Sequence, residues 1–247
     1  DGAFDGSALL RASLRRAARR ARAVTAVSRY AAADLETRFG AREVQIVPNG
    51  LDLHEPVGAP PAGLPERYVA AIGRLVHNKG YDLLIEAFAR LGRADLGLVI
   101  GGDGPERDHL VRRARNLGIG DRVVLPGRLS RGQVGAVLRG AELLVMPSRA
   151  EAFGIAVLEG WRAAAPVIAS NRGGAPEFVT DGRDGLLVDP TDVPALAAAM
   201  TRVLGDPEWA GSLARSGRLR VQDFDWAAVV ERYESLYDRA PARGRRS

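Results

Sequence analysis

Short apolar segments alternate with longer amphipathic segments from Tyr68 onward, and this alternation constrains the fold more than any other feature. The apolar segments have the length of buried strands, and the segments between them have the period of helices. Such alternation favours a parallel sheet with crossover helices, so the expected fold class is α/β, a doubly wound parallel sheet. The expected strands span 68–73, 96–101, 123–126, 142–147, 166–170 and 185–188. The expected helices span 80–92, 105–118, 130–140, 155–165, 174–179 and 192–205.

The flanking regions show other patterns. Residues 8–22 predict an arginine-rich helix, and two short strands, 24–27 and 43–47, are expected on either side of a helix that Ser28 caps. Proline and glycine are frequent between 48 and 65, which indicates a loop or linker. Two more helices are expected near 207–221 and 226–239.

Composition excludes several kinds of site. The 247 residues contain no cysteine, which rules out disulfides, thiolate metal sites and a cysteine nucleophile and fits a cytoplasmic location. No apolar run reaches the length of about 18 residues that predicts a transmembrane helix. The net charge of +5 suits an anionic ligand. Nucleic acid is not expected as a partner. The basic segment 8–22 is expected to be the solvated face of an outer helix, with a peripheral contact at the inner face of the membrane as the alternative.

Lys79 is the single lysine among 35 lysine and arginine residues. A position that stays lysine in an arginine-rich chain favours a compact ammonium group over a planar guanidinium. Lys79 and Arg74 lie on the loop between the first expected strand of the sheet and the next helix, where backbone N–H groups and the helix dipole attract an anion. This loop predicts a phosphate site, and the alternative is a surface lysine retained by chance.

Two glutamates follow the fourth expected strand of the sheet, where ligands bind in folds of this class. Glu151 lies in the loop and Glu159 lies in the helix after it. Carboxylates accept hydrogen bonds from vicinal hydroxyls, which suits a ligand with a sugar and a ribose, and amides near Gly154 suit the phosphates between them. The alternatives are a helix-dipole role for Glu151 and an ion pair between Glu159 and Arg162.

A combination of motifs closely resembles the donor half of family 4 retaining glycosyltransferases, which have the GT-B architecture of two facing Rossmann-like domains. The motifs are Gly73-Arg74 with Lys79-Gly80, the pair Glu151 and Glu159, the segment from Gly173 to Glu177, the segment from Gly182 to Val188, and Val47-Pro48-Asn49-Gly50. The resemblance extends from about Ala23 to Asp238 and therefore covers nearly the whole chain.

This resemblance implies a domain organisation. Most of the family's N-terminal domain has no counterpart in the sequence, so the chain is expected to be a fragment or a truncated form that lacks an acceptor pocket and transfers no sugar alone. The implied parts are a remnant of the acceptor domain (1–50), a linker (51–66), a Rossmann-like domain that binds a nucleotide sugar (67–222), and a C-terminal helix with a basic tail (223–247).

The resemblance also implies an activity, which is transfer of a hexose from a nucleoside diphosphate sugar, with UDP or GDP, to an acceptor hydroxyl with retention of configuration. The acceptor is a glycan, a lipid or a small molecule. Arg74 and Lys79 would hold the diphosphate, Glu151 the donor sugar and Glu159 the ribose. The implied catalytic residues are Arg74, Lys79 and Glu151. The implied donor-binding residues are Gly73, Arg128, Leu129, Phe153, Gly154, Ile155 and Glu159, with Arg128 and Leu129 beside the base.

Other interpretations are weaker. Asp223 and Asp225 match a metal-binding Asp-x-Asp pattern, but they precede a helix that Asp225 is expected to cap, so no metal and no cofactor other than the donor are expected. Arg107 replaces the last glycine of a dinucleotide fingerprint, and Pro105 is expected to be the first helical residue, which argues against a dehydrogenase. A nucleotide-sugar epimerase of the same architecture and a non-catalytic nucleotide-sugar-binding module remain as alternatives.

Overall fold

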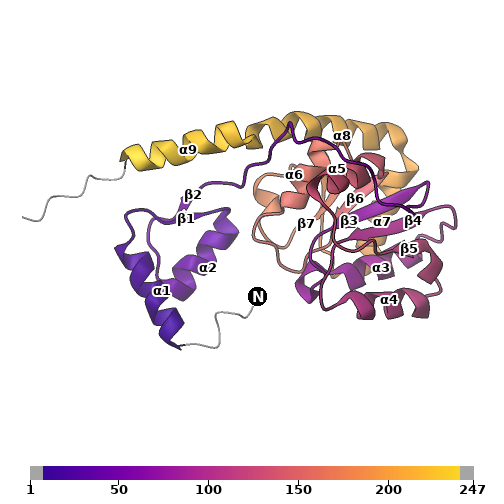
Figure 1. Ribbon diagram of the computed structural model, residues 1–247, viewed down its shortest axis with the longest axis horizontal. Coiled ribbons are helices and arrows are strands. Elements are labelled where there is room, and N and C mark those ends of the chain that lie inside the picture. Colours follow the sequence, from indigo (N-terminus) through magenta and orange to yellow (C-terminus); the bar gives the residue numbers. More distant parts are fainter. Residues whose placement is uncertain (1–7, 240–247) are drawn as a thin grey trace, which may run out of the picture.

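The computed structural model describes residues 8–239, which form a larger α/β part and a smaller N-terminal lobe (Figure 1). All the strands of the larger part are parallel and form one six-stranded sheet in the order β5-β4-β3-β6-β7-β8. The expected α/β class and parallel sheet are thereby confirmed. The strands are β3 (Tyr68–Ile72), β4 (Gly97–Gly101), β5 (Val123–Val124), β6 (Leu143–Met146), β7 (Val167–Ser170) and β8 (Leu186–Val188).

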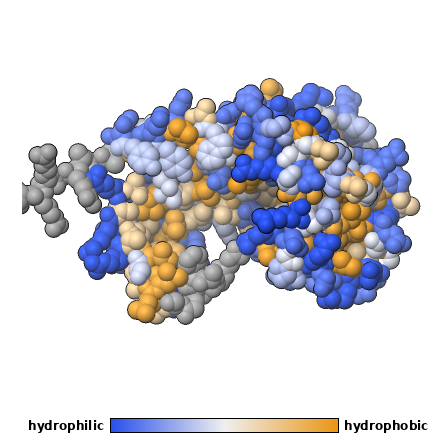
Figure 2. All heavy atoms as spheres, viewed as in Figure 1, coloured by the Kyte–Doolittle hydropathy of each residue, from blue (hydrophilic) through white to orange (hydrophobic). Residues whose placement is uncertain are grey.

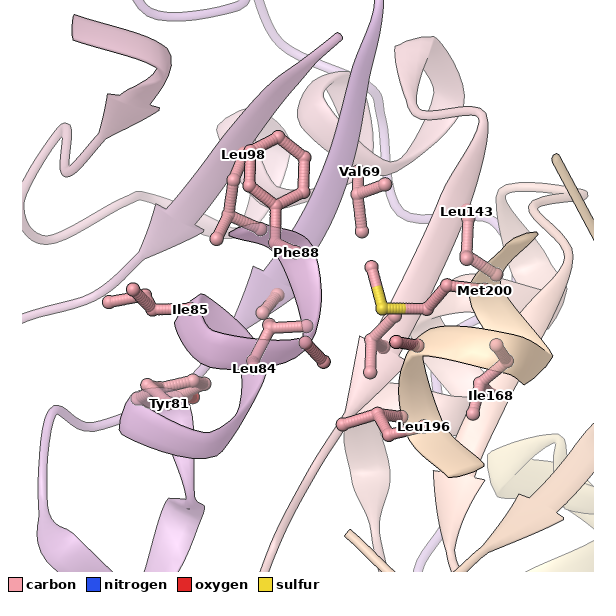
Figure 3. Close-up of a cluster of buried hydrophobic side chains, with 14 of the residues drawn as sticks. Val69, Tyr81, Leu84, Ile85, Phe88, Leu98, Leu143, Ile168, Leu196 and Met200 are labelled. Carbon is pink, nitrogen blue, oxygen red and sulfur yellow. The ribbon is translucent and has the colours of Figure 1, made fainter. Parts of the chain in front are cut away.

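Helices cover both faces of this sheet, and each face has its own hydrophobic core. On one face α3 and α7 pack together, and their side chains Leu84, Phe88 and Met200 are completely buried against the strands (Figure 3). Burial of such a side chain contributes about 1.5–3 kcal/mol. The helices of the larger part are α3 (Tyr81–Arg90), α4 (Arg107–Asn116), α5 (Arg131–Gly140), α6 (Ile155–Arg162), α7 (Val193–Gly205) and α8 (Pro207–Arg220).

The opposite face is held by aromatic side chains. Phe153 stacks on Phe178 with ring centroids 4.6 Å apart, and Trp161 meets Phe178 edge-on at 5.7 Å. The indole N–H of Trp161 donates a hydrogen bond of 2.7 Å to the carbonyl of Asp184. Because Phe153 comes just before α6 and Trp161 lies within it, this cluster fixes the position of the start of α6.

Two expected helices differ from the sequence prediction. The helix expected at 174–179 is only a 3-10 turn, η4 (Ala175–Glu177), because the Asp184 carboxylate accepts the Thr180 N–H at 2.8 Å and begins a different turn there. Pro105 is not the first helical residue, since α4 begins at Arg107. The backbone N–H of Glu106 instead donates to the carbonyl of Leu75 at 3.0 Å and joins two loops above the sheet.

The N-terminal lobe contains two helices and a parallel pair of very short strands. Ser28 caps the second helix as expected, since its hydroxyl accepts a hydrogen bond of 3.0 Å from the backbone N–H of Ala31. The first helix has no buried residue, and apolar atoms lie open on this lobe (Figure 2). The elements are α1 (Ala8–Arg20), β1 (Thr25–Ala26), α2 (Arg29–Phe39) and β2 (Gln45–Ile46).

The chain between the two parts is anchored on the larger one. Leu51 donates its backbone N–H to the carbonyl of Phe224 at 2.8 Å, and Arg162 binds both the carbonyl of Asp52 at 2.8 Å and the Glu55 carboxylate at 2.9 Å. After the 3-10 turn η5 (Val221–Phe224), α9 (Trp226–Arg239) extends back toward the N-terminal lobe (Figure 1). Within residues 8–239, no helix has the length and apolar character needed to cross a membrane.

Candidate functional site

The centre of the sheet sets the place of the site. Strands β3 and β6 are neighbours there, and the sheet grows from β3 toward β4 on one side and from β6 toward β7 on the other. Loops at the carboxyl ends of two such strands diverge and leave a crevice, which is where ligands bind in doubly wound folds. The loop after β3 and the loop after β6 together line a cavity of about 320 Å³.

Lys79 and Glu151, predicted from sequence to act on two parts of one ligand, form an ion pair in this cavity. The side chains are mostly buried, with exposed fractions of 23% for Lys79 and 14% for Glu151. Ser148 donates a hydrogen bond of 3.2 Å to the same Glu151 oxygen. Burial and the charge of Glu151 raise the pKa of the neighbouring Tyr81 hydroxyl above its ordinary value, so Tyr81 remains protonated.

Arg149 joins the two loops, although the sequence did not predict a role for it. Its guanidinium binds the Asp82 carboxylate through two hydrogen bonds of 2.7 and 2.6 Å and donates to the carbonyl of His77 at 2.8 Å. Its backbone N–H donates to the carbonyl of Asn78 at 2.7 Å. Bidentate pairs of this kind fix orientation as well as distance. Arg149 therefore holds the Lys79 loop at a set distance from the Glu151 loop.

The start of α6 brings further predicted residues to the same cavity. Gly154 has a φ of 108°, a backbone conformation that favours glycine, and it turns the chain from the loop into α6. Glu159 lies one turn into this helix and lines the cavity, as Glu151 does. The other predicted residues around it are Gly73, Arg74, Phe153, Gly154 and Ile155.

A second cavity, of about 460 Å³, adjoins the first and shares Gly73 and Arg74 with it. Its walls include Arg128 and Leu129, together with the glycine-rich loop after β4. Gly102 in that loop donates its N–H to the carbonyl of Gly127 at 2.9 Å, which joins the walls. All the residues predicted for the site thus line two adjoining cavities, and Arg74 lines both.

The N-terminal lobe also contributes to the site. Val27 and Asn49 line the first cavity, although neither was predicted as a site residue. Asn49 belongs to the motif Val47-Pro48-Asn49-Gly50, which was recognised from sequence without a role. This motif was the available signal for Asn49, whereas Val27 lies in an ordinary apolar segment and carried none.

Glu159 is in an unusual electrostatic environment. Burial raises the pKa of its carboxyl to about 7, the positive charge of Arg162 opposes the shift, and the negative charge of Glu55 adds to it. Because the shift favours the protonated form, ionisation of Glu159 destabilises the folded state once the pH is above the ordinary pKa of a glutamate.

We expect Glu159→Gln to be more stable than the wild type at pH 8, by a margin that is larger than at pH 5. A carboxyl whose pKa is higher in the folded than in the unfolded state loses stability as pH rises toward the folded value, by at most about 3 kcal/mol here. Urea unfolding of both proteins at the two pH values measures the difference. A free-energy difference between variant and wild type that does not change with pH would contradict the assigned environment of Glu159.

The alternative metal pattern lies away from these cavities. Asp223 forms an ion pair with Arg220, and the Asp225 carboxylate accepts the N–H of Ala227 at 3.0 Å at the start of α9. In the part of the chain that the structure describes, no group of three or more His, Cys, Asp or Glu residues could hold a metal ion. Asp225 therefore lies at the N-terminal cap of α9, as the sequence predicted.

A doubly wound domain with a polar, two-compartment site at its topological switch point belongs to a class of ligand-binding α/β domains. The comparison with known families is more specific. The family described as glycosyl transferases group 1 matches residues 59–220, and the chain belongs to this family. A second family, described as Glycosyltransferase Family 4, matches residues 4–55.

Individual relatives agree with the family. A GDP-mannose-dependent alpha-(1-6)-phosphatidylinositol monomannoside mannosyltransferase from Mycolicibacterium smegmatis is 36% identical over 227 residues, which cover 84% of this chain and 59% of the relative. A glycogen synthase from Mycobacterium tuberculosis is 37% identical over 213 residues, which cover 84% of this chain and 51% of the synthase. The structure of sucrose-phosphate synthase from Thermosynechococcus elongatus matches with a TM-score of 0.83 at 29% identity, over 94% of this chain and 61% of the synthase. The chain thus spans roughly half to three fifths of these proteins.

Proposed function

We propose that this chain carries the donor half of a retaining family 4 glycosyltransferase, which moves a hexose from a nucleoside diphosphate sugar to an acceptor hydroxyl. One observation carries the proposal: Lys79, Glu151 and Glu159 line one cavity, and Arg74 lines both it and a second cavity beside Arg128. Together the two cavities offer cations for a diphosphate and carboxylates for sugar hydroxyls, which suits the parts of such a donor.

The donor fits the two compartments as follows. The base lies in the second cavity beside Arg128 and Leu129, and the ribose hydroxyls donate to the Glu159 carboxylate. The diphosphate lies against Arg74 and Lys79, and the hexose hydroxyls donate to Glu151. The name of the Mycolicibacterium relative, which specifies GDP-mannose, supports a nucleotide sugar as the donor.

The chemistry depends on the leaving group. The bond between the anomeric carbon and the diphosphate oxygen breaks, the acceptor oxygen forms a bond to that carbon, and the proton of the acceptor hydroxyl passes to the departing diphosphate. Negative charge grows on the departing diphosphate, and Lys79 and Arg74 are placed to stabilise it. One preorganised contact of this kind contributes roughly 3–4 kcal/mol to the transition state. The acceptor, which is a glycan, a lipid or a small molecule, binds outside these cavities.

Calorimetric titration of the 247-residue chain with UDP, GDP and ADP, followed by assays with nucleotide sugars and an acceptor panel, tests the proposal. We expect one nucleoside diphosphate to bind, and we expect no sugar transfer, because the chain spans only part of its relatives' length and we assign the acceptor pocket to the remainder. Failure of every nucleotide to bind would contradict the donor site. Transfer by this chain alone would contradict the division between donor and acceptor parts.

Binding of the nucleoside diphosphate is expected to need no divalent ion, because side-chain cations face the diphosphate. Affinity in EDTA should equal affinity in Mn²⁺, and Asp223→Asn should bind as wild type does. The titration is repeated in both buffers with both proteins. Binding that is lost in EDTA, restored by Mn²⁺ and abolished in Asp223→Asn would assign the diphosphate to a metal at Asp223 and Asp225.

A further inference from the structure

Glu177 joins two regions that are far apart in the sequence. Its carboxylate accepts two backbone hydrogen bonds from the start of α2, one of 2.7 Å from the N–H of Arg29 and one of 2.9 Å from the N–H of Tyr30. These N–H groups lie at the positive end of the helix dipole, where a carboxylate is stabilised. Glu177 therefore holds the N-terminal lobe on the larger part of the molecule.

Ser28 makes a second contact between the same regions, at the Glu151 loop. Its hydroxyl donates a hydrogen bond to the carbonyl of Ala152 while it accepts the N–H of Ala31. Ser28 is only 1% exposed, so this contact is shielded from water. Since Ala152 directly follows Glu151, the start of α2 lies against the loop that carries the proposed sugar-binding carboxylate.

The segment that carries Glu177 also supports Glu151 from behind. Gly173 forms a β-bridge with Glu151, and the N–H of Gly174 donates to the carbonyl of Glu151 at 2.9 Å. A Cβ atom on Gly173 would lie 2.1 Å from that carbonyl oxygen, so the two backbones can approach this closely only with glycine. The N–H of Glu177 then closes the turn on the carbonyl of Gly174 at 3.1 Å.

We propose that Glu177 is a positioning residue for the sugar end of the donor site. It holds α2, Ser28 then binds the carbonyl of Ala152, and Gly174 binds the carbonyl of Glu151, while Val27 becomes part of the cavity wall. Glu177 itself lines neither cavity. This inference rests on the proposed function, because it assigns Glu151 to the donor sugar.

The position of this contact predicts a selective effect. We place the base and the diphosphate against Arg128, Arg74 and Lys79, whereas the start of α2, which Glu177 holds, contacts the backbone just after Glu151. The hexose is the part that needs the Glu151 loop. Loss of the Glu177 charge should therefore weaken binding of the nucleotide sugar while the nucleoside diphosphate still binds, whereas general loosening of the fold would weaken both.

The test uses Glu177→Gln, which keeps the side-chain volume and one acceptor oxygen, and Ser28→Ala, which removes the second contact independently. Glu208→Gln, on an exposed residue of α8, is the matched control. Affinities for the nucleoside diphosphate and for its nucleotide sugar are measured by calorimetry, and amide hydrogen exchange is followed over 24–39. We expect the affinity of both variants for the nucleotide sugar to fall at least about tenfold and their affinity for the diphosphate to fall less than about twofold. Amide hydrogens in 24–39 should also lose protection from exchange.

Unchanged affinity for the nucleotide sugar in both variants, or equal losses for the two ligands, would overturn the inference while leaving the donor site intact. Absence of nucleoside diphosphate binding in the wild-type chain would instead overturn the proposed function, and the inference with it. Equal behaviour of Glu208→Gln and Glu177→Gln would show that the effect is one of net charge, which also overturns the positioning role.

Discussion

Replacement of Lys79 by alanine is expected to weaken nucleoside diphosphate binding at least tenfold. A charge-assisted hydrogen bond to phosphate is worth about 1.5–3 kcal/mol, and about 1.4 kcal/mol corresponds to a tenfold change in affinity. The loss has a second component. Lys79 pairs with Glu151 in the cavity, so its removal leaves a mostly buried carboxylate without its cation, close to the proposed diphosphate position.

Two further variants separate these components in the same calorimetric titration. Lys79→Arg should not restore full affinity, because a planar guanidinium differs from an ammonium in shape and in the directions of its donors. The double variant Lys79→Ala/Glu151→Gln should bind the diphosphate more tightly than Lys79→Ala, since the unpaired negative charge is gone. Wild-type affinity in Lys79→Ala would remove this residue from the diphosphate site.

Gly80→Ala is expected to destabilise the protein by about 1–3 kcal/mol more than Gly92→Ala. The two glycines lie at opposite ends of α3 and have similar φ values, 68° and 63°, so alanine meets comparable backbone strain at each. The surroundings differ. A Cβ at Gly80 would lie 2.0 Å from the carbonyl oxygen of Pro147, whereas a Cβ at Gly92 would have nothing within 4 Å.

Urea unfolding measures both variants, and the difference between them reports the contact between the two site loops rather than backbone strain. The Pro147 carbonyl begins the loop that carries Glu151, so relief of the clash must move Gly80, and with it the adjacent Lys79, away from that loop. Gly80→Ala should consequently also lose nucleoside diphosphate affinity if it folds. Equal stability of the two variants would show that the loops after β3 and β6 do not approach each other as closely as described.

Much of the architecture follows from local patterns. The alternation of segments predicted the parallel sheet, because the length and period of an apolar run depend on the face that it buries. Lys79, Glu151 and Glu159 were chosen as site residues because of their chemistry and their places after strands, and the structure brings them to one cavity. Topology explains this convergence, since carboxyl ends of parallel strands share one edge of a sheet.

Contacts between distant segments could not be predicted in the same way. Arg149 and Asp82 are 67 residues apart, and Glu177 and Arg29 are 148 apart, so no local spacing indicates either pair. The environment of Glu159 was also hidden, because its pKa depends on burial and on Glu55 from another segment. The short η4 turn was mistaken for a helix although the hydrogen bond beyond it, from the N–H of Thr180 to the Asp184 carboxylate, is local.

The central claim is that the two adjoining cavities at the switch point bind a nucleoside diphosphate. A crystal structure of the chain with the nucleotide that binds in calorimetry tests it most directly. The account predicts the diphosphate against Arg74 and Lys79, the ribose on Glu159 and the base beside Arg128 and Leu129. A nucleotide bound elsewhere, or bound here with its phosphates away from Lys79, would contradict it.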